Sequence, residues 1–85
     1  MSEELEKLKK KILYRASYRG TKEMDILLSG FVKKYIENFD MAQLIELEKF
    51  LKLEDETILN FYNFNVSDNR IDKNPISSIF KKYKI

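Results

Sequence analysis

The sequence predicts one all-α domain, a compact five-helix bundle, over residues 1–85. Hydrophobic residues make up 44% of the chain, which is too apolar for a disordered protein. Two glycines and one proline are too few turn-forming residues for a fold of many strands. In successive segments, moreover, apolar residues recur at the spacing of an amphipathic helix.

The first two helices are predicted on either side of Gly20 and should form a hairpin. From Glu3 to about Tyr18, four apolar residues share one helical face: Leu5, Leu8, Ile12 and Ala16. We expect Gly20 to end this helix through a turn with positive φ, and Thr21 to cap the next. The second helix has the strongest periodicity and should be the central core helix, with Met24, Leu27, Leu28, Phe31, Tyr35 and Phe39 facing inward.

Three further helices complete the predicted bundle. Asp40 and Gln43 form a capping box at the start of the third helix, which should end near Leu53. The acidic residues 54–56 then open a short aromatic helix, because carboxylates stabilise a helix N-terminus. Residues 65–74 are polar and are predicted to form a loop, after which Asn74 and Pro75 begin the last helix as cap and first residue.

Composition excludes several classes of function. Without cysteine or histidine the chain has no disulfide or thiolate site and lacks the usual side chain for proton transfer and metal binding. The segment around Asp68 and Asp72 lacks the glycine and the closing glutamate of a calcium loop. No apolar run approaches the roughly 18 residues of a membrane span. We therefore expect a non-enzyme with no catalytic residue and no metal or cofactor site, which works by binding another protein.

Two of the three arginines stand one helical turn apart, directly before Gly20. The planar guanidinium groups of Arg15 and Arg19 are suited to bidentate contact with a partner's carboxylate or phosphate. An alternative interpretation is a pair of internal ion pairs, for instance with Glu23 or Asp25. The residues alone leave both interpretations open.

Exposed apolar groups are expected around the same turn. A helical projection places Tyr14 and Tyr18 opposite the apolar face of their helix, and tyrosines beside arginines are typical of interface hot spots. Alternatively, both rings pack on the C-terminal segment. In the second helix, Glu23, Ile26 and Gly30 should face outward. A glycine inside a helix costs about 1 kcal/mol relative to alanine. Close approach by another element or by a partner would explain Gly30, and simple tolerance of the cost is the alternative.

The run of residues 13–28, LYRASYRGTKEMDILL, resembles the Arg-Gly-x-x-Glu signature region of the succinate dehydrogenase assembly factors, also called FAD assembly factors. A weaker resemblance continues from Asp40 to Phe61. At the position of Phe61 the family usually has tryptophan. Tyr18 also departs from the pattern, because a basic residue or histidine is frequent there. The compact five-helix fold of the family agrees with the prediction above.

The resemblance implies a chaperone-like factor that binds the flavoprotein subunit of succinate dehydrogenase and, in some bacteria, that of fumarate reductase. FAD would become linked to a histidine of that partner, and no cofactor would be bound covalently by this chain. The signature falls on Arg19, Gly20 and Glu23, with Arg15 and Asp25 at its flanks. Together with the exposed groups, the predicted partner-binding residues are Arg15, Tyr18, Arg19, Gly20, Glu23, Asp25 and Ile26.

We expect a monomer when free, in the cytoplasm of a bacterium. The mitochondrial matrix is less favoured, because the first residues are acidic and show no transit peptide. The alternative function is a small helical nucleic-acid-binding or regulatory protein, which predicts affinity that falls steeply with salt. The 16 basic residues are interleaved with 14 acidic ones, however, so the net charge of +2 does not call for nucleic acid as a partner.

Overall fold

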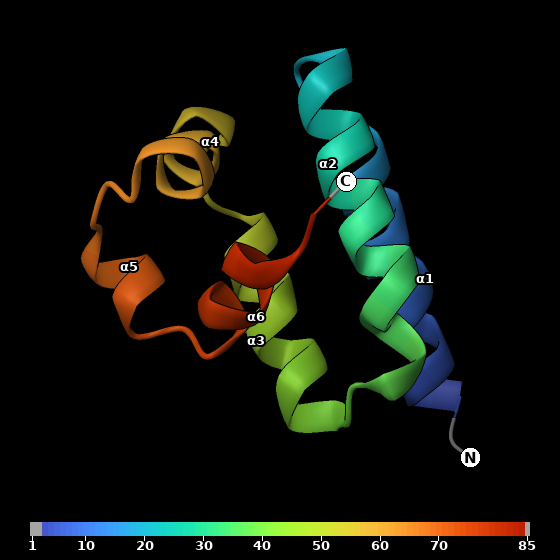
Figure 1. Ribbon diagram of the computed structural model, residues 1–85. Coiled ribbons are helices and arrows are strands. Elements are labelled where there is room, and N and C mark those ends of the chain that lie inside the picture. Colours follow the sequence, from blue (N-terminus) through green and yellow to red (C-terminus); the bar gives the residue numbers. More distant parts are fainter. Residues whose placement is uncertain (1–2, 85) are drawn as a thin grey trace.

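The computed structural model describes residues 3–84, so Met1, Ser2 and Ile85 of the predicted domain lie outside the described residues. Helices follow one another throughout this range, with no strand among the described residues, which confirms the all-α prediction (Figure 1). The helices are α1 (Glu3–Ser17), α2 (Lys22–Tyr35), α3 (Met41–Leu51), α4 (Asp55–Phe64), α5 (Asn69–Asp72) and α6 (Ile76–Lys82). A 3-10 turn, η1 (Ile36–Asn38), follows α2. The predicted count of five helices is wrong, since residues 3–84 contain six.

Helices α1 and α2 form the predicted antiparallel hairpin, with the connecting turn at the top of Figure 1. Thr21 caps α2 as expected, because its hydroxyl oxygen accepts a hydrogen bond of 3.2 Å from the backbone N–H of Met24. The apolar face of α2 is buried at Met24, Leu27, Leu28, Phe31 and Val32. The helix ends at Tyr35, four residues earlier than Phe39, which is extended but still buried.

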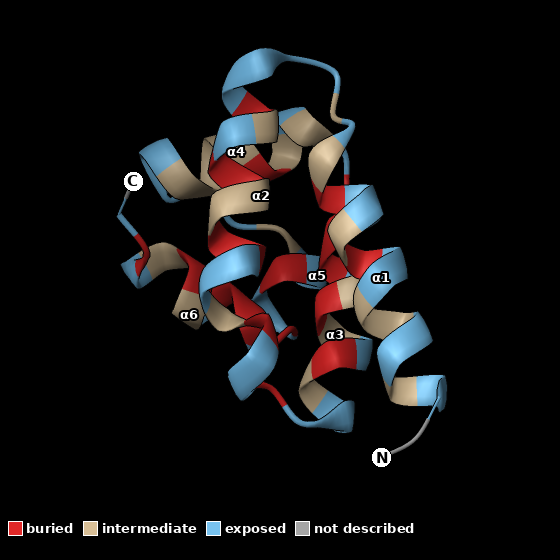
Figure 2. Cartoon of the chain, turned by 90° about the vertical axis from the view of Figure 1, so that its right-hand side faces the viewer, coloured by how far each residue is buried: buried red, intermediate tan, exposed pale blue. Residues whose placement is uncertain are grey.

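Helix α3 begins with the predicted capping box. The backbone N–H of Gln43 donates to Asp40 Oδ1 at 2.9 Å, and that of Asp40 donates to Gln43 Oε1 at 3.0 Å. Leu44, Leu47 and Phe50 are fully buried on the inner face of α3. Buried residues gather where α1, α2 and α3 meet (Figure 2).

Helix α6 closes the core between α2 and α3. The ring of Phe80 lies 5.1 Å from that of Phe31 and 5.2 Å from that of Phe50, centroid to centroid. Asn74 holds the start of α6, because its Oδ1 accepts from the N–H of Ile76 at 2.8 Å while its Nδ2 donates to the carbonyl of Glu46 at 2.9 Å. Helix α6 thus begins one residue later than predicted, with Pro75 in the N-cap position, but Asn74 still binds the first N–H of the helix, and the same side chain ties α6 to α3.

The sixth helix, α5, lies within the segment that was predicted to be a loop. Helix α4 ends at Phe64, and Asn65 caps it with a left-handed φ of 57°. Asp68 then caps a single helical turn by accepting from the N–H of Arg70 at 2.8 Å. Ile71 is buried on this turn and anchors it to the core. The polar segment 65–74 contains only two apolar residues, Val66 and Ile71, whose spacing of five shows no helical period, so the sequence did not predict α5.

Within residues 3–84, no helix combines the length and the apolar character that crossing a bilayer requires.

Candidate functional site

The residues predicted to bind a partner surround the turn between α1 and α2, residues 18–21, which we call the corner (Figure 2, top). In this turn Arg19 is the side chain with the most internal contacts. Its Nε donates to Asp55 Oδ1 at 2.8 Å, and its Nη2 lies 2.6 Å from the same oxygen. Its Nη1 donates to the carbonyls of Leu51 at 2.8 Å and Arg15 at 3.2 Å, and its Nη2 donates to that of Leu53 at 3.2 Å. Its side chain is only 11% exposed.

Of the two interpretations of Arg19, the internal ion pair is therefore the one found. The partner is Asp55, the first residue of α4, rather than Glu23 or Asp25. A buried guanidinium needs its donors satisfied, and the carboxylate and three carbonyls of this chain supply the acceptors. Arg19 thus joins the corner to the connection between α3 and α4.

Close approach of Asp55, and not the backbone conformation, favours glycine at position 20. The prediction of a positive φ at Gly20 is wrong, because no glycine of the described residues has one. The N–H of Gly20 donates to Asp55 Oδ2 at 3.0 Å. A Cβ at this position would lie 3.2 Å from the same oxygen, closer than ordinary van der Waals contact. A single carboxylate therefore binds both members of the Arg-Gly pair.

Around this internal frame, several predicted residues face solvent. Tyr14 and Tyr18 are 66% and 75% exposed, and their ring centroids lie 4.7 Å apart. The alternative in which both rings pack on the C-terminal segment is therefore wrong. Ile26 is 50% exposed, as its outward position predicted. Arg15 and Glu23 are also exposed, whereas Asp25 is half-buried.

Gly30 contacts another element of the same chain. A Cβ on Gly30 would lie 2.5 Å from the hydroxyl oxygen of Tyr83, so the glycine makes room for the ring that follows α6. Of the interpretations left open for Gly30, approach by another element of the chain is the one found. Tyr83 itself is buried.

A shallow, open groove lies beside the corner, between the end of α1 and the connection from α3 to α4. The residues that line it are Arg15, Tyr18, Arg19, Gly20, Leu51, Lys52, Leu53, Glu54 and Asp55. Sequence reasoning missed the contribution of Lys52, Leu53 and Asp55. The acidic run from Glu54 was interpreted only as a helix start, and pairing across 36 residues of sequence leaves no signal in local spacing.

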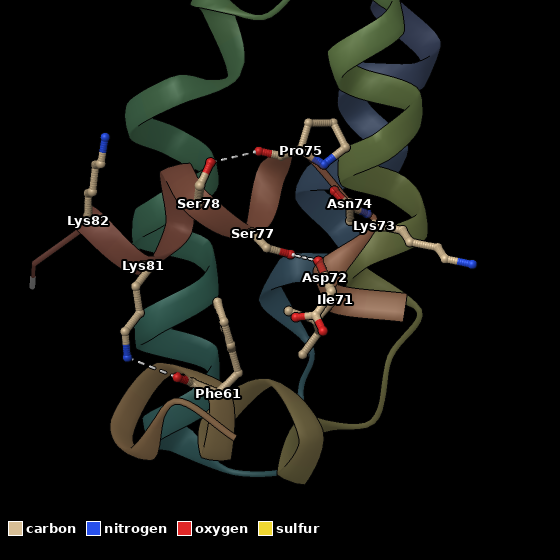
Figure 3. A pocket seen from close by; sticks show the side chains of 10 residues that line it. All are labelled: Phe61, Ile71, Asp72, Lys73, Asn74, Pro75, Ser77, Ser78, Lys81 and Lys82. Atoms are coloured by element: carbon tan, nitrogen blue, oxygen red, sulfur yellow. Dashed lines mark hydrogen bonds between the residues drawn. The ribbon is translucent and has the colours of Figure 1, made fainter. Parts of the chain in front are cut away.

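Two further hollows open on the surface. One adjoins the groove and shares Lys52 and Leu53 with it, and the other lies between α4, α5 and α6 (Figure 3). The polar groups of this hollow are largely used inside the protein. Lys81 Nζ donates to the carbonyls of Phe61 at 3.0 Å and Tyr62 at 2.7 Å, where a cation stabilises the C-terminal end of α4. The hydroxyls of Ser77 and Ser78 donate to backbone carbonyls of Ile71 and Pro75.

Cations dominate the strip where α1 faces α3, next to the groove. Lys11 Nζ lies 2.8 Å from Glu48 Oε2, and this ammonium holds the pKa of the Glu48 carboxyl below its usual range. Lys52 and Arg15 lower the same pKa from a greater distance. The carboxylate of Glu48 is therefore paired with Lys11.

The surface at the corner presents charged and aromatic side chains. Among residues 3–84, no three or more acidic side chains gather where they could hold a metal ion. The groove offers the exposed cations of Arg15 and Lys52, the exposed ring of Tyr18, and a turn in which Asp55 binds the N–H of Gly20. Such a mixture of charged rim and apolar anchor is typical of a protein interface.

Comparison with known proteins gives a consistent result. The profile of a protein family described as flavinator of succinate dehydrogenase matches residues 10–84. Succinate dehydrogenase assembly factor 2, mitochondrial, of Scheffersomyces stipitis is 32% identical over 83 residues, which cover 98% of this chain and 52% of that protein. The mitochondrial assembly factor 2-B of Drosophila willistoni is 41% identical over 49 residues, which are 58% of this chain and 31% of that protein.

A bacterial relative is also found. FAD assembly factor SdhE of Acetobacter pasteurianus is 30% identical over 53 residues, covering 62% of this chain and 49% of that protein. The chain thus spans about a third to a half of the length of the curated relatives it matches. No solved structure matches it at a significant level.

Proposed function

The chain belongs to the family of succinate dehydrogenase flavinators, and from this membership we propose that it binds the flavoprotein subunit of that enzyme and promotes covalent attachment of FAD to it. The observation that carries the proposal is the match over residues 10–84, which includes the Arg-Gly-x-x-Glu signature at the exposed corner. The flavoprotein of fumarate reductase is a second candidate partner. The relatives support either a bacterial cytoplasm or a mitochondrion as the location, and we favour the cytoplasm.

In this proposal the chain acts by binding and performs no covalent chemistry. The FAD and the histidine to which it becomes linked both belong to the partner. Binding energy from the corner stabilises the arrangement of the flavoprotein in which these two groups meet in reactive geometry. The contribution of this chain is to hold that arrangement, which is the role of a chaperone rather than an enzyme.

The residues of the corner divide between support and contact. Arg19 and Gly20 are bound to Asp55, so they fix the shape of the turn. The exposed groups around them supply the contact: Arg15, Tyr18, Glu23 and Ile26. Asp25, half-buried in the first turn of α2, lies at the edge of this surface.

Glu23 offers the sharpest test of the corner. It is exposed in the first turn of α2 and makes no hydrogen bond or ion pair within residues 3–84, so Glu23→Arg costs the fold only the dipole term, about 0.3 to 1 kcal/mol. Gly20→Arg is a poorer probe, because its side chain would also disturb the contact with Asp55. Glu4→Arg is the matched control, since Glu4 is an exposed acid in the first turn of α1 at the other end of the hairpin.

The measurement is covalent flavin on the succinate dehydrogenase flavoprotein after incubation with FAD, read as fluorescence of the denatured band on a gel. Wild type and Glu4→Arg should raise the yield of covalent flavin equally. Glu23→Arg should need at least about fivefold more protein for the same yield, which corresponds to roughly 1 kcal/mol of lost binding. If wild type gives no increase, the proposed function is wrong; if Glu23→Arg equals wild type, the corner is not the contact.

A further inference from the structure

The groove beside the corner contains two cations without a carboxylate of their own. Both carboxylates that line it are engaged: Asp55 binds Arg19 and the N–H of Gly20, and Glu54 Oε1 lies 3.3 Å from Arg70 Nη2. The guanidinium of Arg15 and the ammonium of Lys52 form no ion pair or hydrogen bond with any residue from 3 to 84. Both residues are exposed.

Glu48, which lies outside the groove lining, does not pair with these two cations either. Glu48 lies between α1 and α3, but Lys11 occupies it at 2.8 Å. Arg15 and Lys52 act on Glu48 only from a distance. The residues that line the groove carry three cations and two carboxylates, a net charge of +1, and within residues 3–84 Arg15 and Lys52 are the two of these cations that no carboxylate pairs with directly.

The other residues that line the groove indicate which kind of anion it would bind. The backbone N–H of Gly20, the obvious donor for a phosphate at a turn, is already bound to Asp55. The groove is shallow and open, and its rim carries the Tyr18 ring, which is 75% exposed. Two cations and an exposed aromatic ring around an open groove, with the turn N–H already bound, suit a stretch of polypeptide with acidic side chains better than a compact phosphate.

We propose that this groove binds an acidic segment of the flavoprotein partner, and that Arg15 and Lys52 are the cations that hold its carboxylates. The inference rests on the proposed function and adds the chemistry of the partner to it. It also separates the two arginines before the glycine: Arg19 shapes the turn, and Arg15 contacts the partner. Lys52, which lies outside the signature region, becomes part of the interface.

The test measures the affinity of purified chain variants for the purified flavoprotein subunit by titration calorimetry. The variant Arg15→Glu/Lys52→Glu should bind at least about tenfold more weakly, because each attraction becomes a repulsion. The control Lys10→Glu/Lys33→Glu makes the same change in net charge at two exposed lysines that form no ion pair within residues 3–84. Both lie away from the corner along α1 and α2, so its affinity should stay within about twofold of wild type.

Other outcomes decide between alternatives. If wild type binds and the two double variants weaken binding equally, the groove is not the site, although the proposed function stands. If wild type does not bind, the proposed function itself fails. Millimolar free FAD that displaces the flavoprotein from wild type, but not from a variant lacking both cations, would assign the groove to phosphate and overturn the inference.

A second double variant, Arg15→Gln/Lys52→Gln, tests whether the loss of affinity comes from misfolding. It removes both charges without adding carboxylates near Glu48. This variant should keep the helical circular dichroism of wild type and still lose affinity several-fold. Its association rate should also depend less on salt than that of wild type, since steering by the two charges is gone. An unchanged affinity and an unchanged salt dependence would contradict the proposal.

Discussion

Asp55 connects three parts of the chain with one carboxylate. Its Oδ1 accepts from Arg19, its Oδ2 accepts from Gly20, and its backbone begins α4. The two adjacent residues Arg19 and Gly20 therefore bind the same group. The remaining donors of Arg19 reach the carbonyls of Leu51 and Leu53 at the end of α3, where a helix leaves carbonyls without partners.

This geometry predicts different effects for the same substitution at Arg19 and Arg15. Lysine keeps the charge but cannot place donors on one carboxylate and three carbonyls at once, so Arg19→Lys should lower the free energy of unfolding by about 1 to 3 kcal/mol. Arg15→Lys changes an exposed side chain and should stay within about 0.5 kcal/mol of wild type. Urea denaturation followed by circular dichroism measures both. Equal effects of the two substitutions would show that the contacts of Arg19 do not stabilise the corner.

Capping residues close in sequence predicted where the helices begin, whereas contacts between residues far apart in the sequence were not predicted. Thr21 and the Asp40–Gln43 box cap their helices with partners three residues away, so the sequence contains both halves of each interaction. The exposure of Tyr18 and Ile26 followed from projecting regular helices. In contrast, Asp55 lies 36 residues from Arg19, and no spacing rule could pair them. The short α5 escaped for a different reason, because four residues are too few to show a period.

The packing of α2 against the segment after α6 depends on Gly30, because Tyr83 approaches this residue closely. The hydroxyl of Tyr83 stands where a Cβ on residue 30 would be, whereas the ring carbon that bears it lies at an ordinary 3.6 Å. Tyr83 is buried against Phe31, with ring centroids 5.6 Å apart. Alanine at position 30 therefore conflicts with the hydroxyl alone.

A double-mutant cycle tests this contact between α2 and Tyr83. Gly30→Ala should stabilise α2 by about 1 kcal/mol through higher helix propensity. In the wild-type background, the cost of displacing the Tyr83 hydroxyl should offset this gain. In Tyr83→Phe the hydroxyl is absent, so the same substitution should stabilise the protein by close to the full amount. The coupling between the two sites, measured by thermal or urea unfolding, should be at least about 0.5 kcal/mol. Additive effects would mean that the ring already moves freely away from Gly30.

Charged contacts across the protein fasten α1 to the remaining helices. Lys9 Nζ lies 2.9 Å from Glu37 Oε1 in η1, and this carboxylate raises the pKa of Lys9. Lys11 makes the corresponding contact with Glu48 in α3 at 2.8 Å. One ion pair joins α1 to η1, and the other joins α1 to α3. The position of α1 sets the position of the corner, so these pairs also support the proposed interface.

The Lys11–Glu48 pair predicts how the stability of the fold depends on pH. The pKa of Glu48 lies below its ordinary value of 4.5 in the folded protein, chiefly because of the Lys11 ammonium, and returns to that value on unfolding. The unfolded state therefore binds the proton more readily, so the contribution of Glu48 is complete well above pH 4.5 and is lost as the pH falls through the lowered folded pKa. Glu48→Gln should reduce the free energy of unfolding at pH 7 by about 0.5 to 1 kcal/mol, since Lys11 is half exposed and solvent screens the pair. Urea titrations between pH 7 and 3 should show the wild-type and variant curves converging at the acid end, while the control Glu4→Gln follows wild type throughout. A difference between wild type and Glu48→Gln that stays constant down to pH 3 would show that the ion pair does not stabilise the folded state.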